Sequence, residues 1–219
     1  MRGVLCGAHR QTEVGEEATG LDWAPVEPKE WVEKHGGYLD DTPEERSELG
    51  KGAFAVTYRM AAPGGLLCAV KRFQRRDMVK AGLTEDAVLK EAEVLGKLLH
   101  PSVVRFLGLL RTRRHLLLVM ELAAGGSLAD QVRLLPPAAQ VEAWVRQLAS
   151  ALAYMHWRGC VHRDIKNANL LLADGGGGGG VRVADFGLAF LAESSAASQL
   201  MSRAGTSAYL SPERGRGVE

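Results

Sequence analysis

The stretch His162-Arg163-Asp164-Ile165-Lys166-Asn167-Ala168-Asn169 decides the fold of this chain, and Asp185-Phe186-Gly187 follows it after a short interval. Together the two stretches supply Asp164, Asn169 and Asp185, which are two carboxylates and one amide. If folding brings these groups into one cleft, the two negative charges repel each other unless cations and their ligands lie between them. Carboxylate and amide oxygens suit a hard divalent ion, so the pattern indicates a site for metal and phosphate.

Two further stretches lie upstream. In Leu49-Gly50-Lys51-Gly52-Ala53-Phe54-Ala55-Val56, the glycines allow backbone N–H groups to approach phosphate oxygens. Taken alone, such an incomplete GxGxxG is more often an ordinary turn. A dinucleotide-binding fold needs a helix after the turn, whereas the residues after Val56 continue as a strand. Cys68-Ala69-Val70-Lys71 then places Lys71 on the returning strand.

These four stretches, in this order, resemble the motifs of the eukaryotic serine/threonine protein kinase catalytic domain. The resemblance implies an α+β, bilobal protein-kinase-like fold with a small antiparallel sheet N-lobe carrying one helix and an incomplete, mainly helical C-lobe. It implies a kinase domain over residues 43–219. Ahead of it, residues 1–42 mix acids, glycines and prolines without strand alternation, which predicts a flexible N-terminal tail. Within the kinase domain, the N-lobe is expected at about 43–121 and the C-lobe portion at about 122–219.

The activity implied by the resemblance is transfer of the γ-phosphoryl group of ATP to Ser or Thr hydroxyls of protein substrates. In that case Asp164 accepts the proton of the attacking hydroxyl, and Lys166 steadies the γ-phosphate. Lys71 contacts the α and β phosphates, and Glu91 on the following helix holds Lys71 in place. For Glu91 the alternative is the solvated side of an amphipathic helix, which is the commoner position of a glutamate.

The cofactors implied by the resemblance are ATP and Mg²⁺, with Asn169 and Asp185 as the metal ligands. His162 is expected to pack under the site as a core histidine. The implied ATP-binding residues surround the phosphates, the adenine and the ribose, although the apolar ones among them would equally pass as core. They are Leu49, Gly50, Lys51, Gly52, Ala53, Phe54, Ala55, Val56, Ala69, Lys71, Met120, Glu121, Leu122, Ala123, Ser127 and Leu171.

Hydrophobic spacing predicts the elements that carry these motifs. A hairpin is expected from strands at 54–61 and 66–73, with Pro63-Gly64-Gly65 as its turn, and a second hairpin from apolar runs at 103–110 and 116–120. Thr84 is expected to cap a helix that ends before Pro101. The residues Val88, Ala92, Leu95 and Leu99 are expected on its buried face. After Pro136-Pro137 a long helix is expected, with a core stripe of Val141, Val145, Leu148, Leu152 and Met155.

The composition excludes several classes of partner. The net charge of +1 provides no broad basic field, which argues against nucleic acid or an anionic membrane as the main partner. Two local basic runs, at 71–80 and 111–114, are typical of solvated faces. Three widely spaced cysteines without a CxxC pair fit a reducing compartment, and we expect a cytoplasmic or nuclear protein.

The chain also departs from the kinase pattern. After Ser211-Pro212-Glu213 only six residues remain, so the long helix is expected to lose part of its cover and to need a partner over the incomplete C-lobe. The alternative function is therefore a weak or inactive kinase fragment that acts as a nucleotide-binding or regulatory module. Arg163 suggests control by phosphorylation, but Ala87 and Phe190 occupy the positions of basic helpers, which predicts a weak switch.

Overall fold

The computed structural model describes residues 46–61, 67–174, 180–191, 206 and 209. The chain divides into two compact units. The first comprises Met1–Leu83 with Phe106–Met120, and the second comprises Thr84–Arg105 with Glu121–Glu219. The predicted N-terminal tail lies outside the described residues, as does the predicted turn at Pro63-Gly64-Gly65.

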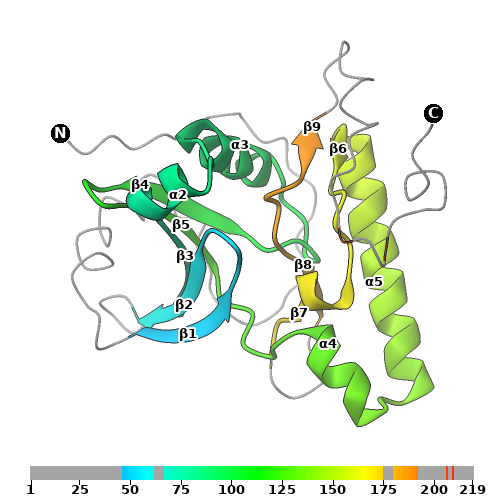
Figure 1. The fold of residues 1–219 in the computed structure, drawn as a ribbon. Coiled ribbons are helices and arrows are strands. Elements are labelled where there is room, and N and C mark those ends of the chain that lie inside the picture. Colours follow the sequence, from blue (N-terminus) through cyan, green and yellow to red (C-terminus); the bar gives the residue numbers. More distant parts are fainter. Residues whose placement is uncertain (1–45, 62–66, 175–179, 192–205, 207–208, 210–219) are drawn as a thin grey trace. The chain divides into compact units, whose positions relative to one another are not determined.

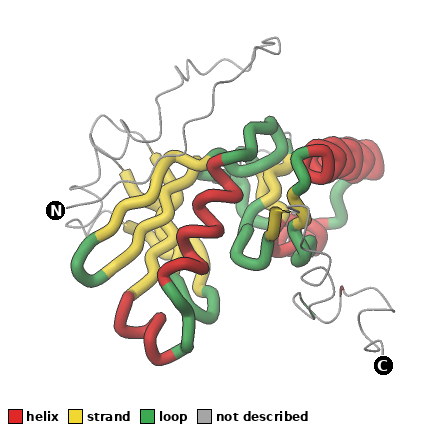
Figure 2. Tube along the Cα trace, turned by 90° about the horizontal axis from the view of Figure 1, so that it is seen from above, coloured by secondary structure: helices red, strands yellow, loops and turns green. Residues whose placement is uncertain are grey.

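The first unit is built on a five-stranded sheet with the strand order β1-β2-β3-β5-β4 (Figure 1). Its strands are β1 (Arg46–Lys51), β2 (Val56–Ala61), β3 (Leu67–Gln74), β4 (Phe106–Arg111) and β5 (His115–Glu121). The β1–β2, β2–β3 and β4–β5 pairs are antiparallel. Figure 2 shows the strands side by side in one layer. Both predicted hairpins are therefore confirmed.

The first predicted strand starts two residues late, at Val56 rather than Phe54. The reason is local, because the N–H of Gly52 donates to the carbonyl of Ala55 at 2.9 Å and closes a turn there. The second predicted hairpin also starts later than expected, since β4 begins at Phe106. Val103 instead forms an isolated bridge with Val183 in the second unit.

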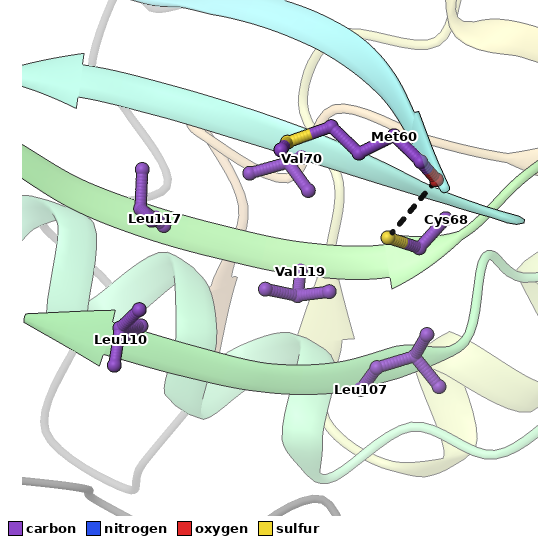
Figure 3. Close-up of a cluster of buried hydrophobic side chains, with 7 residues drawn as sticks. All are labelled: Met60, Cys68, Val70, Leu107, Leu110, Leu117 and Val119. Atoms are coloured by element: carbon purple, nitrogen blue, oxygen red, sulfur yellow. Dashed lines mark hydrogen bonds between the residues drawn. The ribbon is translucent and has the colours of Figure 1, made fainter. Parts of the chain in front are cut away.

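Apolar side chains from four strands form the core of the sheet (Figure 3). They are Met60, Cys68, Val70, Leu107, Leu110, Leu117 and Val119. The thiol of Cys68 donates to the carbonyl of Met60 at 3.6 Å, which satisfies a polar atom inside an apolar cluster. A six-residue helix, α2 (Arg75–Lys80), follows β3 directly and buries only Met78. With a single buried apolar residue, α2 has no periodic signal that the sequence could reveal.

In the second unit, α3 (Glu85–Gly96) begins as predicted at Thr84, whose hydroxyl accepts from the N–H of Ala87 at 3.3 Å. Val88, Ala92 and Leu95 are buried on one face. The prediction for Leu99 is wrong, because the helix ends at Gly96 and Leu99 is 54% exposed. Glycine lowers helix stability, so the helical spacing does not extend to residue 99.

The long predicted helix is α5 (Ala138–Trp157), which follows α4 (Leu128–Gln131) and the 3₁₀ turn η2 (Val132–Leu134). It buries Trp144, Ala151 and Met155. Of the predicted stripe only Met155 is buried, whereas Val141 and Val145 are exposed by 41% and 59%. The exposure of Val145 agrees with the expected loss of cover over the long helix, whereas the core prediction is wrong at Val141, because no described element covers that side of α5. The partner expected there stays a prediction.

Two short antiparallel pairs complete the second unit. They are β6 (Cys160–Val161) with β9 (Phe190–Leu191), and β7 (Leu170–Leu172) with β8 (Val181–Val183), with the 3₁₀ turn η3 (Asn167–Asn169) leading into β7. The combination of a small sheet and a mainly helical second unit confirms the predicted α+β, protein-kinase-like fold class. Within the part of the chain that the structure describes, no helix is long and apolar enough to cross a membrane.

Candidate active site

The two short strand pairs hold the polar motifs of the second unit in place. Between β6 and β7 the chain makes the loop 162–166 and the turn η3, and between β8 and β9 it makes the loop 184–189. These two loops are joined directly, since the N–H of Ala184 donates to the carbonyl of Asn169 at 2.9 Å. Segments that the sequence separates by the six consecutive glycines at 175–180 are thus fixed side by side.

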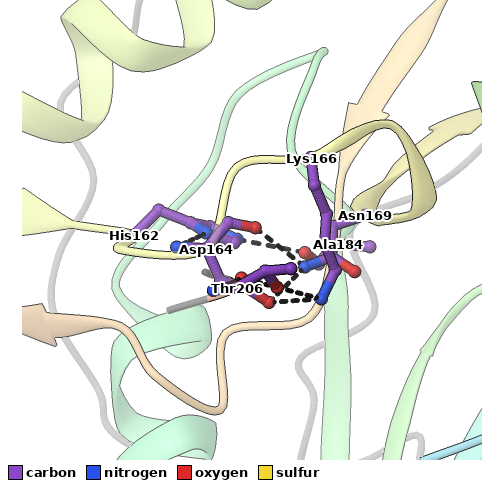
Figure 4. A network of polar contacts seen from close by, with 6 residues as sticks. All are labelled: His162, Asp164, Lys166, Asn169, Ala184 and Thr206. Atoms are coloured by element: carbon purple, nitrogen blue, oxygen red, sulfur yellow. Dashed lines mark hydrogen bonds and ion pairs between the residues drawn. The ribbon is translucent and has the colours of Figure 1, made fainter. Parts of the chain in front are cut away.

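Asp164 lies at the centre of a hydrogen-bond network in these loops (Figure 4). Its Oδ2 accepts from Lys166 Nζ at 2.8 Å and from Asn169 Nδ2 at 3.0 Å. Its Oδ1 accepts from the backbone N–H of Thr206 at 2.9 Å and from the Thr206 hydroxyl at 2.5 Å. Lys166 Nζ also donates to the Thr206 hydroxyl at 2.8 Å, which closes the network. Three of the predicted site residues therefore meet at one carboxylate.

The network keeps Asp164 ionised although its side chain is only 8% exposed. Burial by itself raises the pKa of Asp164, but the hydrogen bonds from Lys166 and Thr206, together with the charge of Lys166, outweigh burial and leave the pKa below its usual value. At neutral pH the group is consequently a carboxylate and can only accept hydrogen bonds. A proton acceptor held in a fixed orientation is what general-base chemistry requires.

His162 has the structural role that was predicted for it. Its side chain is 2% exposed, and its ring contacts the ring of Phe186 edge-on with centroids 4.8 Å apart. Nε2 lies 3.0 Å from the carbonyl of Ala184, and Nδ1 accepts from the N–H of Asp164 at 3.3 Å. Burial lowers the pKa of His162, so the ring is neutral at pH 7. Through its contacts with Asp164 and Ala184 the ring connects the two loops.

The predicted metal ligands lie on the two joined loops. Asn169 is buried and donates both hydrogens of its amide nitrogen to Asp164, one to the carbonyl at 2.8 Å and one to the carboxylate. Its amide oxygen is thereby left as the atom suited to a cation. Asp185 is exposed and has φ at +62°, a conformation that is uncommon for a residue with a side chain. An amide oxygen and an exposed carboxylate fit the oxygen chemistry of Mg²⁺.

Glu91 and Arg163 line a second feature of this unit, a pocket of about 130 Å³. Its walls include Ala87, Lys90, Phe186, Gly187, Ala189 and Phe190. Arg163 Nε donates to the carbonyl of Leu188 at 2.6 Å. Ala87 and Phe190 are small or apolar as predicted, but Lys90 brings a second cation to the pocket. Because the carboxylate of Glu91 lines the same pocket, the charge of Lys90 is offset, and the weak phosphorylation switch stays a prediction.

Glu91 itself is 5% exposed, so the alternative of a solvated glutamate does not hold. Its predicted partner Lys71 belongs to the first unit, where it lies on β3 opposite Thr57 of β2. The Nζ of Lys71 is 5.4 Å from the centre of the Phe73 ring. The pairing of Lys71 with Glu91 remains a prediction.

Most of the predicted phosphate-binding residues lie on β1 and on the turn that follows it, with Val56 starting β2. Leu49 is skipped in the β1–β2 register, which shifts between Glu48 and Gly50. The side chains of Leu49 and Phe54 are about half exposed. On the same sheet, Ala69 and Met120 are buried at 8% each. The first unit thus presents a glycine turn beside a strand that carries a lysine.

The remaining predicted ATP-binding residues belong to the second unit. Glu121 Oε1 accepts from the N–H of Arg105 at 3.1 Å and from Arg182 Nε at 3.2 Å, so its side chain has a structural role. Ser127 and Leu171 form an isolated antiparallel bridge, and the Ser127 hydroxyl donates to Asp130 at 2.6 Å. Leu122 and Ala123, which are partly buried, connect these two anchored positions.

Comparison with known proteins agrees with this geometry. The family model described as "Protein kinase domain" matches residues 44–217. The chain belongs to the protein kinase domain family. It is 39% identical over 171 residues to "CBL-interacting protein kinase 4" of Oryza sativa subsp. japonica, covering 75% of this chain and 37% of that protein. It is 32% identical over 197 residues to "Calcium/calmodulin-dependent protein kinase type IV" of Homo sapiens, covering 89% of this chain and 40% of that protein.

A third relative, "CBL-interacting serine/threonine-protein kinase 7" of Arabidopsis thaliana, is 36% identical over 169 residues and is covered to 38% of its length. The kinase chain described here therefore spans less than half of each of these relatives. The names of all three relatives describe protein kinases. The resemblance drawn from the four sequence motifs is confirmed at the level of the family.

Proposed function

We propose that this chain is an ATP-dependent protein serine/threonine kinase, with the kinase domain over residues 43–219 and a tail over 1–42. The single observation that carries the proposal is the network around Asp164, because it fixes a buried, ionised carboxylate beside a lysine and an asparagine. Such an arrangement orients a proton acceptor and supplies a cation next to it, which are the groups that phosphoryl transfer uses. The family membership supports the same activity.

In the proposed reaction the acceptor hydroxyl attacks the γ-phosphorus of ATP and gives its proton to Asp164. The new bond joins the acceptor oxygen to phosphorus, and the bond between phosphorus and the β,γ-bridging oxygen of ATP breaks to release ADP. Lys166 neutralises charge on the transferred group from its position 2.8 Å from Asp164. Mg²⁺, when bound through Asn169 and Asp185, offsets the charge of the phosphates.

The remaining assignments follow the same proposal. Lys71, held by Glu91, contacts the α and β phosphates. The glycine turn from Leu49 to Val56 covers the phosphates. The residues from Met120 to Ala123 bind the adenine, and Ala69 and Leu171 line the adenine slot. Ser127 lies near the ribose. Ser and Thr are the proposed acceptors because Lys166 and Thr206 carry the resemblance to serine/threonine kinases. Both side chains support this role, since they form hydrogen bonds to each other and to Asp164.

The proposed substrates are proteins, and the proposed compartment is the cytoplasm, with the nucleus as the alternative. Cys68 and Cys160 support a reducing compartment, since both are buried and carry no disulfide. Burial also raises the pKa of the Cys68 thiol to about 12 and that of Cys160 to about 11, so neither is a reactive thiolate at neutral pH.

A radiolabel transfer assay tests the proposal. The chain is incubated with γ-labelled ATP, Mg²⁺ and a general basic protein, and wild type is compared with Asp164→Asn. Glu142→Gln is the matched control, because it neutralises an exposed carboxylate on α5. We expect label on serine and threonine in wild type and control, and a loss of about a hundredfold or more in Asp164→Asn. Absence of transfer in all three proteins would favour the non-catalytic fragment.

A further inference from the structure

A pocket of about 350 Å³ lies in the first unit, and its described lining includes none of the residues assigned to catalysis. Its lining residues are Gln74, Arg75, Arg76, Arg113 and Arg114, and we call it the arginine pocket. The sequence presented these arginines as two separate basic runs, each typical of a solvated face. The fold brings the two runs together, so that four of the five lining residues are permanently charged cations.

The backbone fixes this arrangement on two elements that lie next to each other (Figure 1). The turn between β4 and β5 is closed by Thr112, whose N–H donates to the carbonyl of His115 at 2.9 Å and whose hydroxyl accepts from the N–H of His115. Arg113 and Arg114 lie between these two residues. The start of α2 is tied to the turn, since Arg75 N–H donates to the carbonyl of Arg114 at 2.9 Å and Arg75 Nε to that of Thr112 at 3.1 Å.

Among the residues that the structure describes, no carboxylate lines the arginine pocket. The nearby Asp77 lies 3.8 Å from Arg76 Nε and from Lys80 Nζ, and all three side chains are at least half exposed. Exposed ion pairs of this kind contribute little and leave the local field positive. Guanidinium groups pair in a planar fashion with carboxylates, often through two hydrogen bonds. The chemistry of the pocket therefore fits an acidic peptide.

The charge of the chain is distributed unevenly, and the segment ahead of β1 is itself acidic. Residues 1–45 contain eleven Asp or Glu and four Lys or Arg, a net charge of −7, which leaves +8 for residues 46–219 within the total of +1. Within the first segment, residues 13–38 hold seven acids and two lysines. An acidic stretch thus precedes the sheet whose far end carries the arginine pocket.

The chain between them is long enough for the acidic stretch 13–38 to reach the arginine pocket. Arg46 pairs with Met60, and Met60 with Cys68, so β1 begins level with Cys68. Arg75 follows seven residues farther along, which places the pocket about 25 Å from Arg46 at the usual rise per residue and strand spacing. An extended segment of eight residues spans about 26 Å or more. Residues 38–45 are therefore a sufficient linker for the acids at 13–38.

We propose that the arginine pocket binds the acidic stretch 13–38 of its own chain. Tethering gives the stretch an effective concentration of about 1 mM at the pocket, so that an intrinsic dissociation constant of about 0.5 mM fills two thirds of the pockets. The contact is electrostatic and weakens as salt shortens the screening length. It links the segment ahead of the kinase domain to α2 and to the β4–β5 turn, and it is independent of phosphoryl transfer.

Arginine footprinting of the full chain tests the proposal. Initial rates of phenylglyoxal modification are measured by mass spectrometry at Arg113 and Arg114, with the exposed Arg59 and Arg133 as internal references. Wild type is compared with a variant in which the acids of the stretch become amides of the same size. The changes are Glu13→Gln, Glu16→Gln, Glu17→Gln, Asp22→Asn, Glu27→Gln, Glu30→Gln and Glu33→Gln.

At about 20 mM salt we expect the variant to react about threefold faster at Arg113 and Arg114, with unchanged rates at the references, and about 0.5 M salt should produce the same acceleration in wild type. A free peptide of residues 13–38 should slow the reaction of the variant again. Equal rates in variant and wild type would overturn the proposal. The proposal would also be overturned if inorganic phosphate, or a peptide with its acids changed to amides, protected the variant as strongly as the acidic peptide does. The pocket would then not select carboxylates.

Discussion

The Thr206 hydroxyl is predicted to hold the Asp164 carboxylate in place, and Thr206→Val tests this directly. Valine keeps the shape of threonine but removes one hydrogen bond to Asp164 Oδ1, of 2.5 Å, and one acceptor for Lys166, at 2.8 Å. A hydrogen bond to a charged group contributes about 1.5–3 kcal/mol. Asp164 Oδ1 keeps its hydrogen bond from the backbone N–H of Thr206, and water can reach the partly buried side chain at position 206. We therefore expect a net loss of about 1–2 kcal/mol in the free energy of unfolding.

Urea unfolding at pH 7 measures that loss, and carbon-detected NMR of the Asp164 carboxyl measures its titration. The pKa of Asp164 should rise in Thr206→Val, because the hydroxyl is among the groups that lower it. Thr206→Ser is the matched control, since serine keeps the hydroxyl and should change the free energy of unfolding by about 0.5 kcal/mol or less. An unchanged titration and an unchanged unfolding curve in Thr206→Val would refute the network.

Two further predictions concern stability. Burial lowers the pKa of His162 and, with the charge of Arg182, that of His100, so below about pH 6.5 the unfolded chain takes up protons that the folded chain does not. The free energy of unfolding should thus fall from pH 7 to pH 5.5. The fall should be less steep in His162→Gln and as steep as in wild type in the control His156→Gln. A rise in the free energy of unfolding on acidification would exclude this explanation. Gly125→Ala should cost about 2–3 kcal/mol, because the new Cβ would lie 1.9 Å from the carbonyl oxygen of Asp174. Gly50→Ala meets nothing within 4 Å and should unfold as wild type does; equal curves for both variants would contradict the packing.

Much of the fold could be predicted because the deciding signals are local. Thr84 caps α3 through its own side chain, and short apolar runs bounded by turn residues define both hairpins of the sheet. The motif residues Asp164, Lys166 and Asn169 lie within six positions of one another, so a short turn suffices to bring them together. Local spacing of this kind needs no knowledge of the tertiary structure.

The errors arose where burial depends on distant elements. The spacing of Val141 and Val145 is the same as that of a buried stripe, but which side of α5 is covered depends on neighbours that the spacing does not describe. Lys90 lines the same pocket as Glu91, but its position in the pocket depends on the loop 184–189, which the spacing along α3 does not describe. The arginine pocket was missed for a similar reason, since the two arginine runs are brought together by tertiary hydrogen bonds from the backbone and side chain of Arg75 to the β4–β5 turn.

The central claim is that Asn169 and Asp185 hold Mg²⁺ for a nucleotide triphosphate beside Asp164. Isothermal titration of the chain with ATP, with and without Mg²⁺, tests it most directly in wild type, Asp185→Asn and the control Asp86→Asn, which alters the exposed first turn of α3. The account predicts Mg²⁺-dependent ATP binding that is about tenfold or more weaker in Asp185→Asn and unchanged in Asp86→Asn. ATP binding that is indifferent to Mg²⁺ and to Asp185 would contradict it.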